Sequence, residues 1–590
     1  MKLLLLFFLF STIIFAQDSN NDWKTYYEKS GFKETPHYAE TIEYCKRLAD
    51  ASPMITYTTF GVSPQGRDLP LLIIDKNGNS TAEQVRRTNN VVFLIQAGIH
   101  SGEIDGKDAG FMLIRDMIIE GKNKDLLDHV TILFMPIFSV DGHERFGAYN
   151  RINQNGPEEM GWRVTAQNYN LNRDYLKADA PEMQSWLKLY NTWLPEFFAD
   201  CHVTDGADYQ YAVTYSIEFK HAHHKMVGDW VKNGYLDSVM PAMEKSGFPM
   251  IKYVWFKKVH DPKSGIGLGI AGPRYSNGYT ILHNRPGLLI ETHMFKDYKT
   301  RVDGTYQLLK HSLQILNRDY LKLRDAIAQA DAKTRKDEFR KKTYPLKYKQ
   351  MEDSVLIDFL GYEYTIEKSD LSGGDWQRFS KDSVTMKIPL FNNYQPDITA
   401  QLPEAYIVPV EWTKVIDRIK LHGIRFETLN EEHKIKVSSF KFSNEKWSER
   451  PYENHHTLTF DVEKIEEERL YPKGSIVIPM NQRTAKVIAH ILEPKGPDSF
   501  LFWGFFDSVF EQKEYAESYV MEEYARIMLA NDENLKNKFE QKLKEDKVFA
   551  ADPSKILKWF YRQSPYWDKR INKYPVGKIF DKEVLKRIVN

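Results

Sequence analysis

Short apolar runs alternate with amphipathic segments through the first half of the chain. Uninterrupted runs such as residues 91–95 (VVFLI) are typical of strands buried on both faces of a parallel or mixed sheet. The segments between them, such as residues 111–118, repeat apolar side chains at helical spacing. Strands and helices in alternation predict an α/β fold, in which a mixed central sheet has helices on both faces.

The predicted strands carry polar residues at their carboxyl ends. His100 and Glu103 follow the first of these strands, while His202 and Glu291 each end a later apolar run. Open α/β sheets bind their ligands at this edge, so we expect the four side chains to converge. Two imidazoles and a carboxylate suit a catalytic zinc ion with three protein ligands, and the fourth residue adds a carboxylate beside it. The alternative for each residue alone is a hydrogen-bonded histidine or a solvated glutamate.

The spacing His-x-x-Glu is weak evidence by itself, because the chain contains it more than once. The copies are His37/Glu40, His100/Glu103 and His490/Glu493. The first lies on a polar helical stretch, and the third lies on an apolar run that leads into Pro494. We interpret both as accidental, since only the middle copy follows a predicted buried strand.

The pattern changes beyond about residue 340, where β-branched or alternating runs are separated by turns. These runs predict strands at residues 355–366, 384–390, 435–440, 456–462 and 475–479. Residues 410–422 predict a helix, and the last hundred residues are helical and aromatic again. We therefore expect a catalytic domain at 17–335, a β-rich accessory domain at 340–497 and a helical C-terminal region at 498–590. For the accessory part, packing or positioning is favoured over binding of a polymer or a cell surface.

Composition argues against several classes of partner. A chain of 590 residues needs more than one hydrophobic core. Its 81 basic and 81 acidic residues are dispersed, which disfavours nucleic acid or an anionic membrane as a partner. Beyond the N-terminus no apolar run reaches the roughly 18 residues of a membrane span. Cys45 and Cys201 could pair, but nothing in their setting indicates a disulfide. Nothing in the composition indicates an oligomeric state.

The N-terminus predicts export. Residues 1–16 comprise Lys2, an apolar core from Leu3 to Phe10, and Ile14-Phe15-Ala16 before polar Gln17. This is the layout of a secretory signal peptide with cleavage near Ala16. We therefore expect the mature chain to be secreted or periplasmic.

The motifs of the first half resemble the zinc metallocarboxypeptidases of the carboxypeptidase A type. The matching pieces, in the order of the family, are His100-Ser101-Gly102-Glu103, Asp141-Gly142, Trp162-Arg163, Leu171-Asn172-Arg173, His202 and Glu291. The resemblance covers roughly residues 20–330. It implies a carboxypeptidase-like fold and an enzyme that removes one residue at a time from the C-terminus of a peptide.

The resemblance also implies a role for each matched residue. His100, Glu103 and His202 would hold one Zn²⁺ ion, which lowers the pKa of a water molecule. Glu291 would take the proton of that water as general base and pass it to the leaving amine. Arg163 would stabilise the oxyanion that develops on the scissile carbonyl.

Two further matched residues would bind the substrate. Arg173, with Asn172, would hold the terminal carboxylate, since a guanidinium group suits bidentate binding. The family's mobile tyrosine has two candidates, Tyr275 and Tyr279, and we favour Tyr279. The heptapeptide LNRDYLK occurs twice, but the second copy, at residues 316–322, lies in a predicted long helix and receives no role.

One position departs from the family pattern. An aspartate usually lies two residues before the Asn-Arg pair and bonds a zinc-bound imidazole, but this chain has Asn170 there. Its amide oxygen could still orient a histidine N–H, although it would raise ligand basicity less than a carboxylate. We hypothesise that Asp200, two residues before His202 on the same strand face, shares this task.

The sequence thus predicts a secreted zinc metallocarboxypeptidase that acts on peptides with a free terminal carboxylate. One alternative is a zinc amidohydrolase that deacylates N-acyl amino acids with the same metal set on the same fold. A second is a non-catalytic peptide-binding protein, against which the presence of Glu103, Arg163 and Glu291 argues. Loops within residues 256–284 are expected to select the side chain that is removed.

Overall fold

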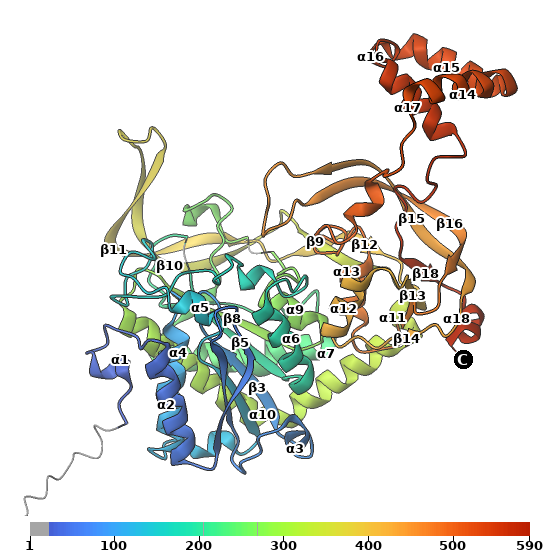
Figure 1. Cartoon of the computed structure of the whole chain (residues 1–590). Coiled ribbons are helices and arrows are strands. Elements are labelled where there is room, and N and C mark those ends of the chain that lie inside the picture. The colour runs from blue at the N-terminus through green and yellow to red at the C-terminus, as the bar shows by residue number, and fades with distance from the viewer. Residues whose placement is uncertain (1–22, 205, 268, 590) are drawn as a thin grey trace, which may run out of the picture.

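The computed structural model describes residues 23–204, 206–267 and 269–589 (Figure 1). The predicted signal peptide at residues 1–16 lies outside these described residues. Within the described ranges, none of the helices combines the length and apolar character that a membrane crossing requires.

An eight-stranded mixed sheet forms the framework of the first half of the chain. Across the sheet the strands follow the order β1-β2-β4-β3-β5-β8-β6-β7, and the central four, β4-β3-β5-β8, are mutually parallel. The strands are β1 (Ile55–Val62), β2 (Asp68–Ile74), β3 (Val91–Gln96), β4 (Val130–Met135), β5 (Phe197–Thr204), β6 (Val213–Ser216), β7 (Met250–Lys252) and β8 (Gly287–His293). The carboxyl ends of β3, β5 and β8 therefore lie at one edge, as the sequence pattern predicted.

Helices cover both faces of this sheet, which confirms the predicted fold class. Side chains alternate between the faces of a strand, so Phe93 and Ile95 pack on one side and Val92 and Leu94 on the other. Helices of the first face are α2 (Tyr38–Ala51), α4 (Asp105–Ile118) and α10 (Tyr298–Arg335), and those of the second are α6 (Pro181–Trp193) and α9 (Ser276–Leu282). Both faces are apolar, which explains why the strands read as unbroken hydrophobic runs.

Helix α4 lies unusually close to the sheet. A Cβ atom on Gly106 would stand 2.4 Å from Cβ of Cys201 on β5, and one on Gly110 would stand 2.4 Å from the ring of Phe134 on β4. Only glycine permits this approach, because real Cβ contacts are never that short. The helix begins two residues after Glu103, so its close packing fixes that residue against β5.

The second half contains a six-stranded sheet of order β14-β17-β13-β18-β15-β16. Its strands are β13 (Ala405–Val408), β14 (Glu427–Thr428), β15 (His433–Trp447), β16 (Leu458–Tyr471), β17 (Ile476–Pro479) and β18 (Gly577–Ile579). Two strand pairs precede it, namely β9 (Tyr344–Gln350) with β12 (Tyr394–Ala400) and β10 (Val355–Lys368) with β11 (Asp375–Leu390). These strands agree with the β-rich character predicted from the sequence.

The C-terminal region, predicted to be helical, is only partly so. Helices α14 (Ser518–Asn531), α15 (Glu533–Glu545), α16 (Lys547–Ala550) and α17 (Pro553–Gln563) form a group that projects from the body (Figure 1). The chain then returns, and β18 pairs with both β13 and β15. Three residues near the C-terminus thus complete a sheet whose other strands come from residues 405–479.

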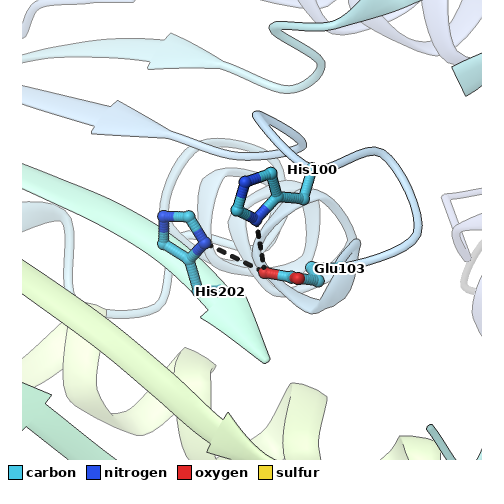
Figure 2. A group of neighbouring side chains, drawn as sticks. All are labelled: His100, Glu103 and His202. Carbon is cyan, nitrogen blue, oxygen red and sulfur yellow. Dashed lines mark hydrogen bonds and ion pairs between the residues drawn. The ribbon is translucent and has the colours of Figure 1, made fainter. Parts of the chain in front are cut away.

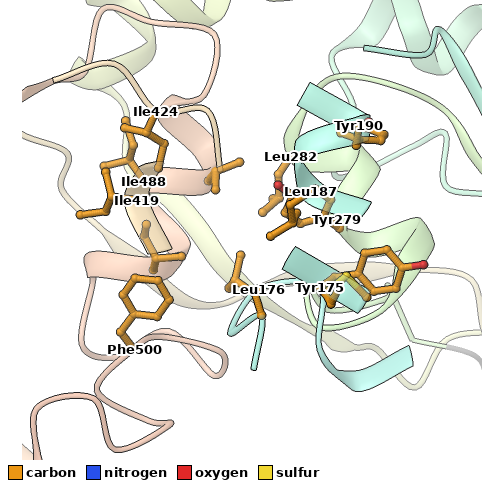
Figure 3. Close-up of a cluster of buried hydrophobic side chains, with 14 of the residues drawn as sticks. Tyr175, Leu176, Leu187, Tyr190, Tyr279, Leu282, Ile419, Ile424, Ile488 and Phe500 are labelled. Atoms are coloured by element: carbon orange, nitrogen blue, oxygen red, sulfur yellow. The ribbon is translucent and has the colours of Figure 1, made fainter. Parts of the chain in front are cut away.

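One buried hydrophobic cluster joins the two halves (Figure 3). Leu187 of α6 and Leu282 of α9 lie on the side of the first half. Ile419 of α12 (Thr413–Leu421) and Ile488 of α13 (Ala485–Leu492) lie opposite them. The second half therefore covers the outer surface of the helices that lie on one face of the eight-stranded sheet.

Candidate metal centre and active site

His100, Glu103 and His202 converge at the carboxyl edge of the sheet (Figure 2). The first two lie in the turn between β3 and α4, and His202 lies on β5. Oε2 of Glu103 is 3.2 Å from Nδ1 of His100 and 2.9 Å from Nδ1 of His202. The two imidazole rings lie 5.0 Å apart, and each of the three residues is 3% exposed. Three possible metal ligands thus share one buried centre.

The outer nitrogen of each imidazole has an acceptor beside it. Nε2 of His100 is 3.1 Å from Oδ1 of Asn170, and Nε2 of His202 is 2.8 Å from Oδ2 of Asp200. Gln96 donates a hydrogen bond of 2.8 Å to the other oxygen of Asp200. With the ring protons on Nε2, both imidazoles would donate to these acceptors and direct their Nδ1 lone pairs toward the centre. They are the contacts that the hypothesis for Asn170 and Asp200 requires.

Burial and charge act differently on the three ligands. Burial lowers the pKa of His100 to about 4. Burial also opposes the charged form of His202, but the Asp200 and Glu103 carboxylates raise its pKa well above the usual value. For Glu103 the effect of burial is outweighed by His100 and Arg151, which hold the pKa of that carboxyl well below its usual range.

The donor set fits a zinc ion. The ligand atoms of His100, Glu103 and His202 lie within 4.8 Å of one another, and this is the one such group among the described residues. Two imidazoles and one ionised carboxylate are a known donor set for catalytic zinc, which leaves a coordination position for water or substrate. The centre also meets the requirement that the ligands be oriented by surrounding hydrogen bonds.

Two arginines approach the outer oxygen of Glu103. Nη2 of Arg151 is 2.9 Å and Nη1 of Arg163 is 3.1 Å from Oε1. The Arg163 side chain is 43% exposed, whereas that of Arg151 is 15% exposed and packs over Gly102. A Cβ atom at position 102 would stand 2.4 Å from Cδ of Arg151, so only glycine allows this arrangement. Sequence reasoning missed Arg151 because its loop has no periodic pattern or recognisable motif.

Glu291 lies beside the three possible ligands. Strands β5 and β8 pair in parallel with His202 directly opposite Glu291. The Glu291 side chain is buried but lines a cavity of about 380 Å³, together with the three possible ligands and Arg163. Asn172 and Arg173 line the same cavity. The predicted metal ligands, general base, oxyanion-binding arginine and carboxylate-binding pair therefore share one space.

The tyrosine favoured from the sequence lies elsewhere. Tyr279 is fully buried in α9, and its hydroxyl lies 2.9 Å from Nδ1 of His422. Tyr275, the other candidate, lines the cavity, and the guanidinium group of Arg173 stacks over its ring at 4.5 Å. Helix α9 begins at Ser276, so Tyr275 precedes the helix while Tyr279 lies one turn inside it, toward the core. The prediction for Tyr279 does not agree with this placement.

The other copies of the two repeated motifs, His490/Glu493 and the second LNRDYLK, make structural contacts away from the cavity. Glu493 forms an ion pair of 2.6 Å with Lys578, which explains its burial without a metal. In the second LNRDYLK copy, Arg318 lies on α10, donates to the carbonyl of Gly234 at 3.1 Å and pairs with Asp319. These positions agree with two interpretations of the sequence. The match at His490/Glu493 is accidental, and the second LNRDYLK copy is part of a helix.

Comparisons with known proteins agree with the geometry of the site. Residues 41–238 match the family described as zinc carboxypeptidase (Peptidase_M14). This match places a zinc carboxypeptidase domain in the first half of the chain. The family consists of metallopeptidases, which are hydrolases.

This chain is also similar to known proteins beyond the matched residues. It is 20% identical to carboxypeptidase 2 of Trichophyton rubrum over 510 residues, which cover 80% of this chain and 84% of the relative. Identity to carboxypeptidase 2 of Trichophyton equinum is 20% over 494 residues, with coverage of 80% and 84%. Among solved structures, a metallo-carboxypeptidase from Pseudomonas aeruginosa is 16% identical, covering 48% of this chain and 69% of that one, with a TM-score of 0.36. Carboxypeptidase A from Helicoverpa armigera is 14% identical, with coverage of 51% and 75% and a TM-score of 0.36.

Proposed function

We propose that the protein is a zinc-dependent metallocarboxypeptidase that hydrolyses the C-terminal peptide bond of peptides with a free terminal carboxylate. The observation that carries this proposal is the cavity itself. It brings together three possible zinc ligands, the Glu291 carboxylate and the Asn172–Arg173 pair. A metal centre alone would suit many hydrolases, whereas a guanidinium group in the same cavity suits a substrate that ends in a carboxylate.

His100, Glu103 and His202 would hold the metal through Nδ1, a carboxylate oxygen and Nδ1. When bound, zinc would polarise the scissile carbonyl and lower the pKa of a water molecule toward neutrality. Glu291 would accept the proton of the attacking water and deliver it to the leaving amine. Its place opposite His202 supports this role, because a general base must lie close to the attacking water.

Arg163 would stabilise the negative charge that develops on the carbonyl oxygen. The support for this role is its exposure at the cavity and its shared contact with Glu103. Arg151 contacts the same oxygen from a more buried position. Arg163 could therefore turn toward a substrate while Glu103 keeps a cationic partner.

Arg173 and Asn172 would bind the terminal carboxylate. Nη1 of Arg173 donates 2.7 Å to the carbonyl of Asn172, and the guanidinium plane rests on the ring of Tyr275. Both contacts limit the motion of a long side chain, so less entropy is lost when the carboxylate binds. Tyr275, rather than Tyr279, is the tyrosine that would contact the substrate.

The test combines metal analysis with matched substrates. The purified full chain should contain one zinc ion and cleave a peptide with a free C-terminus but not the same peptide as its amide. The Glu291→Gln variant should retain zinc and lose roughly 10²–10⁴-fold in kcat. Equal cleavage of the amidated peptide would contradict the proposal, and turnover of N-acyl amino acids alone would instead indicate the deacylase.

Export is a further part of the proposal, and it is supported by the sequence of residues 1–16 alone. Expression of the full chain with its N-terminus intact should yield a secreted or periplasmic product that begins near Gln17. N-terminal sequencing of that product would test the cleavage site.

A further inference from the structure

One wall of the cavity is an irregular segment at residues 253–275, of which residue 268 is not described. We call it the wall segment. Its only regular element among the described residues is a single 3₁₀ turn at Pro262–Ser264. It contributes Gly267, Gly269, Ile270 and Tyr275 to the cavity lining. Glycine loses more conformational freedom on ordering than any other residue, so this segment needs outside support to hold one shape.

The middle of the wall segment is attached to β11 of the second half. The N–H of Ile266 donates to the carbonyl of Pro389 at 2.8 Å, and the N–H of Phe391 donates to the carbonyl of Ile266 at 2.8 Å. Ile266 therefore pairs with Leu390 like a residue of an added parallel strand. Its side chain is fully buried in a cluster with Phe359 of β10. This attachment fixes the position next to Gly267, which lines the cavity.

The end of the wall segment is attached to a second place in the same half. Nε of Arg274 is 2.5 Å from Oδ1 of Asp498, and its Nη2 donates to the carbonyl of Pro497 at 2.9 Å. The guanidinium group also lies over the ring of Trp503 at 4.9 Å. Asp498 is 1% exposed. An ion pair this well buried, with additional hydrogen bonds and aromatic contact, holds its arginine in one position.

Arg274 lies immediately before the residues that would meet the substrate. Tyr275 carries the ring on which Arg173 stacks at 4.5 Å. The N–H of Ser276 donates to Oδ1 of Asn172 at 3.2 Å. A continuous set of contacts thus leads from Asp498, through Arg274 and the next two residues, to the Asn172–Arg173 pair.

We propose that the second half of the chain is part of the substrate-binding apparatus, with Arg274 and Asp498 as positioning residues that hold Tyr275 and Asn172 where the terminal carboxylate binds. This inference rests on the proposed function. Among the described residues, those that line the cavity do not include Arg274 or Asp498, so loss of this pair should affect binding more than chemistry. A displacement of about 1 Å in a positioning group can lower catalytic efficiency roughly 100-fold, and here we expect that loss to appear in KM.

The experiment compares three variants of the full chain. Asp498→Asn and Arg274→Gln each remove one charge, and Arg274→Lys keeps the charge but not the planar fork. We expect KM for a peptide with a free carboxylate to rise about 10- to 100-fold in the first two, with kcat within about 3-fold of wild type. Arg274→Lys should show a smaller rise. Zinc content should stay the same in all three.

Glu404→Gln is the matched control. Its partner Arg340 is 4% exposed and lies 2.9 Å away, so this change also breaks a buried ion pair in the second half. The ion-pair partners of Glu404, Arg340 and Lys582, both lie outside the wall segment, so KM should stay at the wild-type value. Amide hydrogen exchange over residues 269–280 should accelerate in Asp498→Asn and not in Glu404→Gln.

The outcomes separate this inference from the proposed function. If the wild-type chain does not cleave peptides with a free carboxylate, the proposed function fails. If the wild type is active but KM is unchanged in Asp498→Asn and Arg274→Gln, the inference is overturned and the function stands. A fall in kcat with unchanged KM also overturns it. Should Asp498→Asn fail to fold, Arg274→Lys and Arg274→Gln still give the comparison.

Discussion

Replacing Asp200 by asparagine should weaken zinc binding, because in the proposed centre Asp200 would orient the ligand His202 and increase its basicity. Oδ2 of Asp200 lies 2.8 Å from Nε2 of His202, and Gln96 fixes the other oxygen at 2.8 Å. Asp200 is fully buried, so in the variant no bulk water can reach His202 from that side and take the place of the carboxylate. Loss of such a partner typically lowers metal affinity about 10- to 100-fold, which equals about 1.4–2.8 kcal/mol.

At His100, the other histidine of the proposed centre, a substitution can add a carboxylate instead of removing one. Asn170→Asp would place a carboxylate beside Nε2 of His100, where the amide oxygen now lies 3.1 Å away. We expect zinc affinity to increase, by less than Asp200→Asn decreases it, since Asn170 is less buried than Asp200. Asp179→Asn is the matched control, because Asp179 contacts Nε2 of His455 at 2.7 Å and that histidine is no ligand.

Zinc affinity should be measured by competition with a chromophoric chelator at two pH values. Against the effect of burial, Asp200 raises the pKa of His202, so a proton competes with the metal in the wild type. Asp200→Asn relieves that competition, and its loss of affinity should be largest at about pH 8 and smaller at about pH 6. An unchanged affinity at about pH 8, or an equal loss in the Asp179→Asn control, would refute the reasoning.

Three further predictions follow from particular side chains. Burial raises the pKa of Glu182 to about 7, so between about pH 4.5 and pH 7 the folded protein retains a proton that the unfolded chain loses. The free energy of unfolding should therefore fall by about 3 kcal/mol as the pH rises from about 4.5 to above 7. Glu182→Gln should therefore stabilise the protein against urea at about pH 8 and have little effect at about pH 4.5; an equal effect at both would count against it. Tyr275→Phe should change KM or kcat by about 2- to 13-fold, since a hydrogen bond contributes about 0.5–1.5 kcal/mol. Tyr279→Phe should instead lower thermal stability alone. Arg151→Gln leaves Arg163 as the cation beside Glu103, so Arg163 is less free to turn toward the substrate. We expect kcat to fall about 10-fold with zinc retained. An unchanged kcat would exclude Arg151 as the residue that frees Arg163.

The meeting of His100, His202 and Glu291 in one place could be predicted, because each of these residues lies at or just after the end of a buried strand. Strands β3, β5 and β8 are buried on both faces, so each reads as an apolar run that stops at a polar residue. Parallel pairing then places those ends at one edge of the sheet. Neither step needs side-chain geometry. The sequence pattern alone therefore suffices to select His100, His202 and Glu291.

Other parts of the site depend on the phase of a helix or on distant contacts. Tyr275 and Tyr279 differ by one helical turn, and only the observed start of α9 at Ser276 decides which of them faces the cavity. Arg151 reaches Glu103 from an irregular loop, and Gly102 permits that approach. The contact between Arg274 and Asp498 joins residues 224 positions apart. Hydrophobic periodicity carries no information about contacts of these kinds.

The second half completes the catalytic half rather than standing beside it. Leu187 and Leu282 would face water without Ile419 and Ile488 opposite them (Figure 3). Burial of a side chain of this size contributes about 1.5–3 kcal/mol, and a folded domain has a net stability of only about 5–15 kcal/mol. A truncation after α10 would therefore lose stability and substrate binding together, and it could not tell one from the other. Changes at single ion pairs such as Arg274–Asp498, which leave this shared core intact, are the way to separate the two roles.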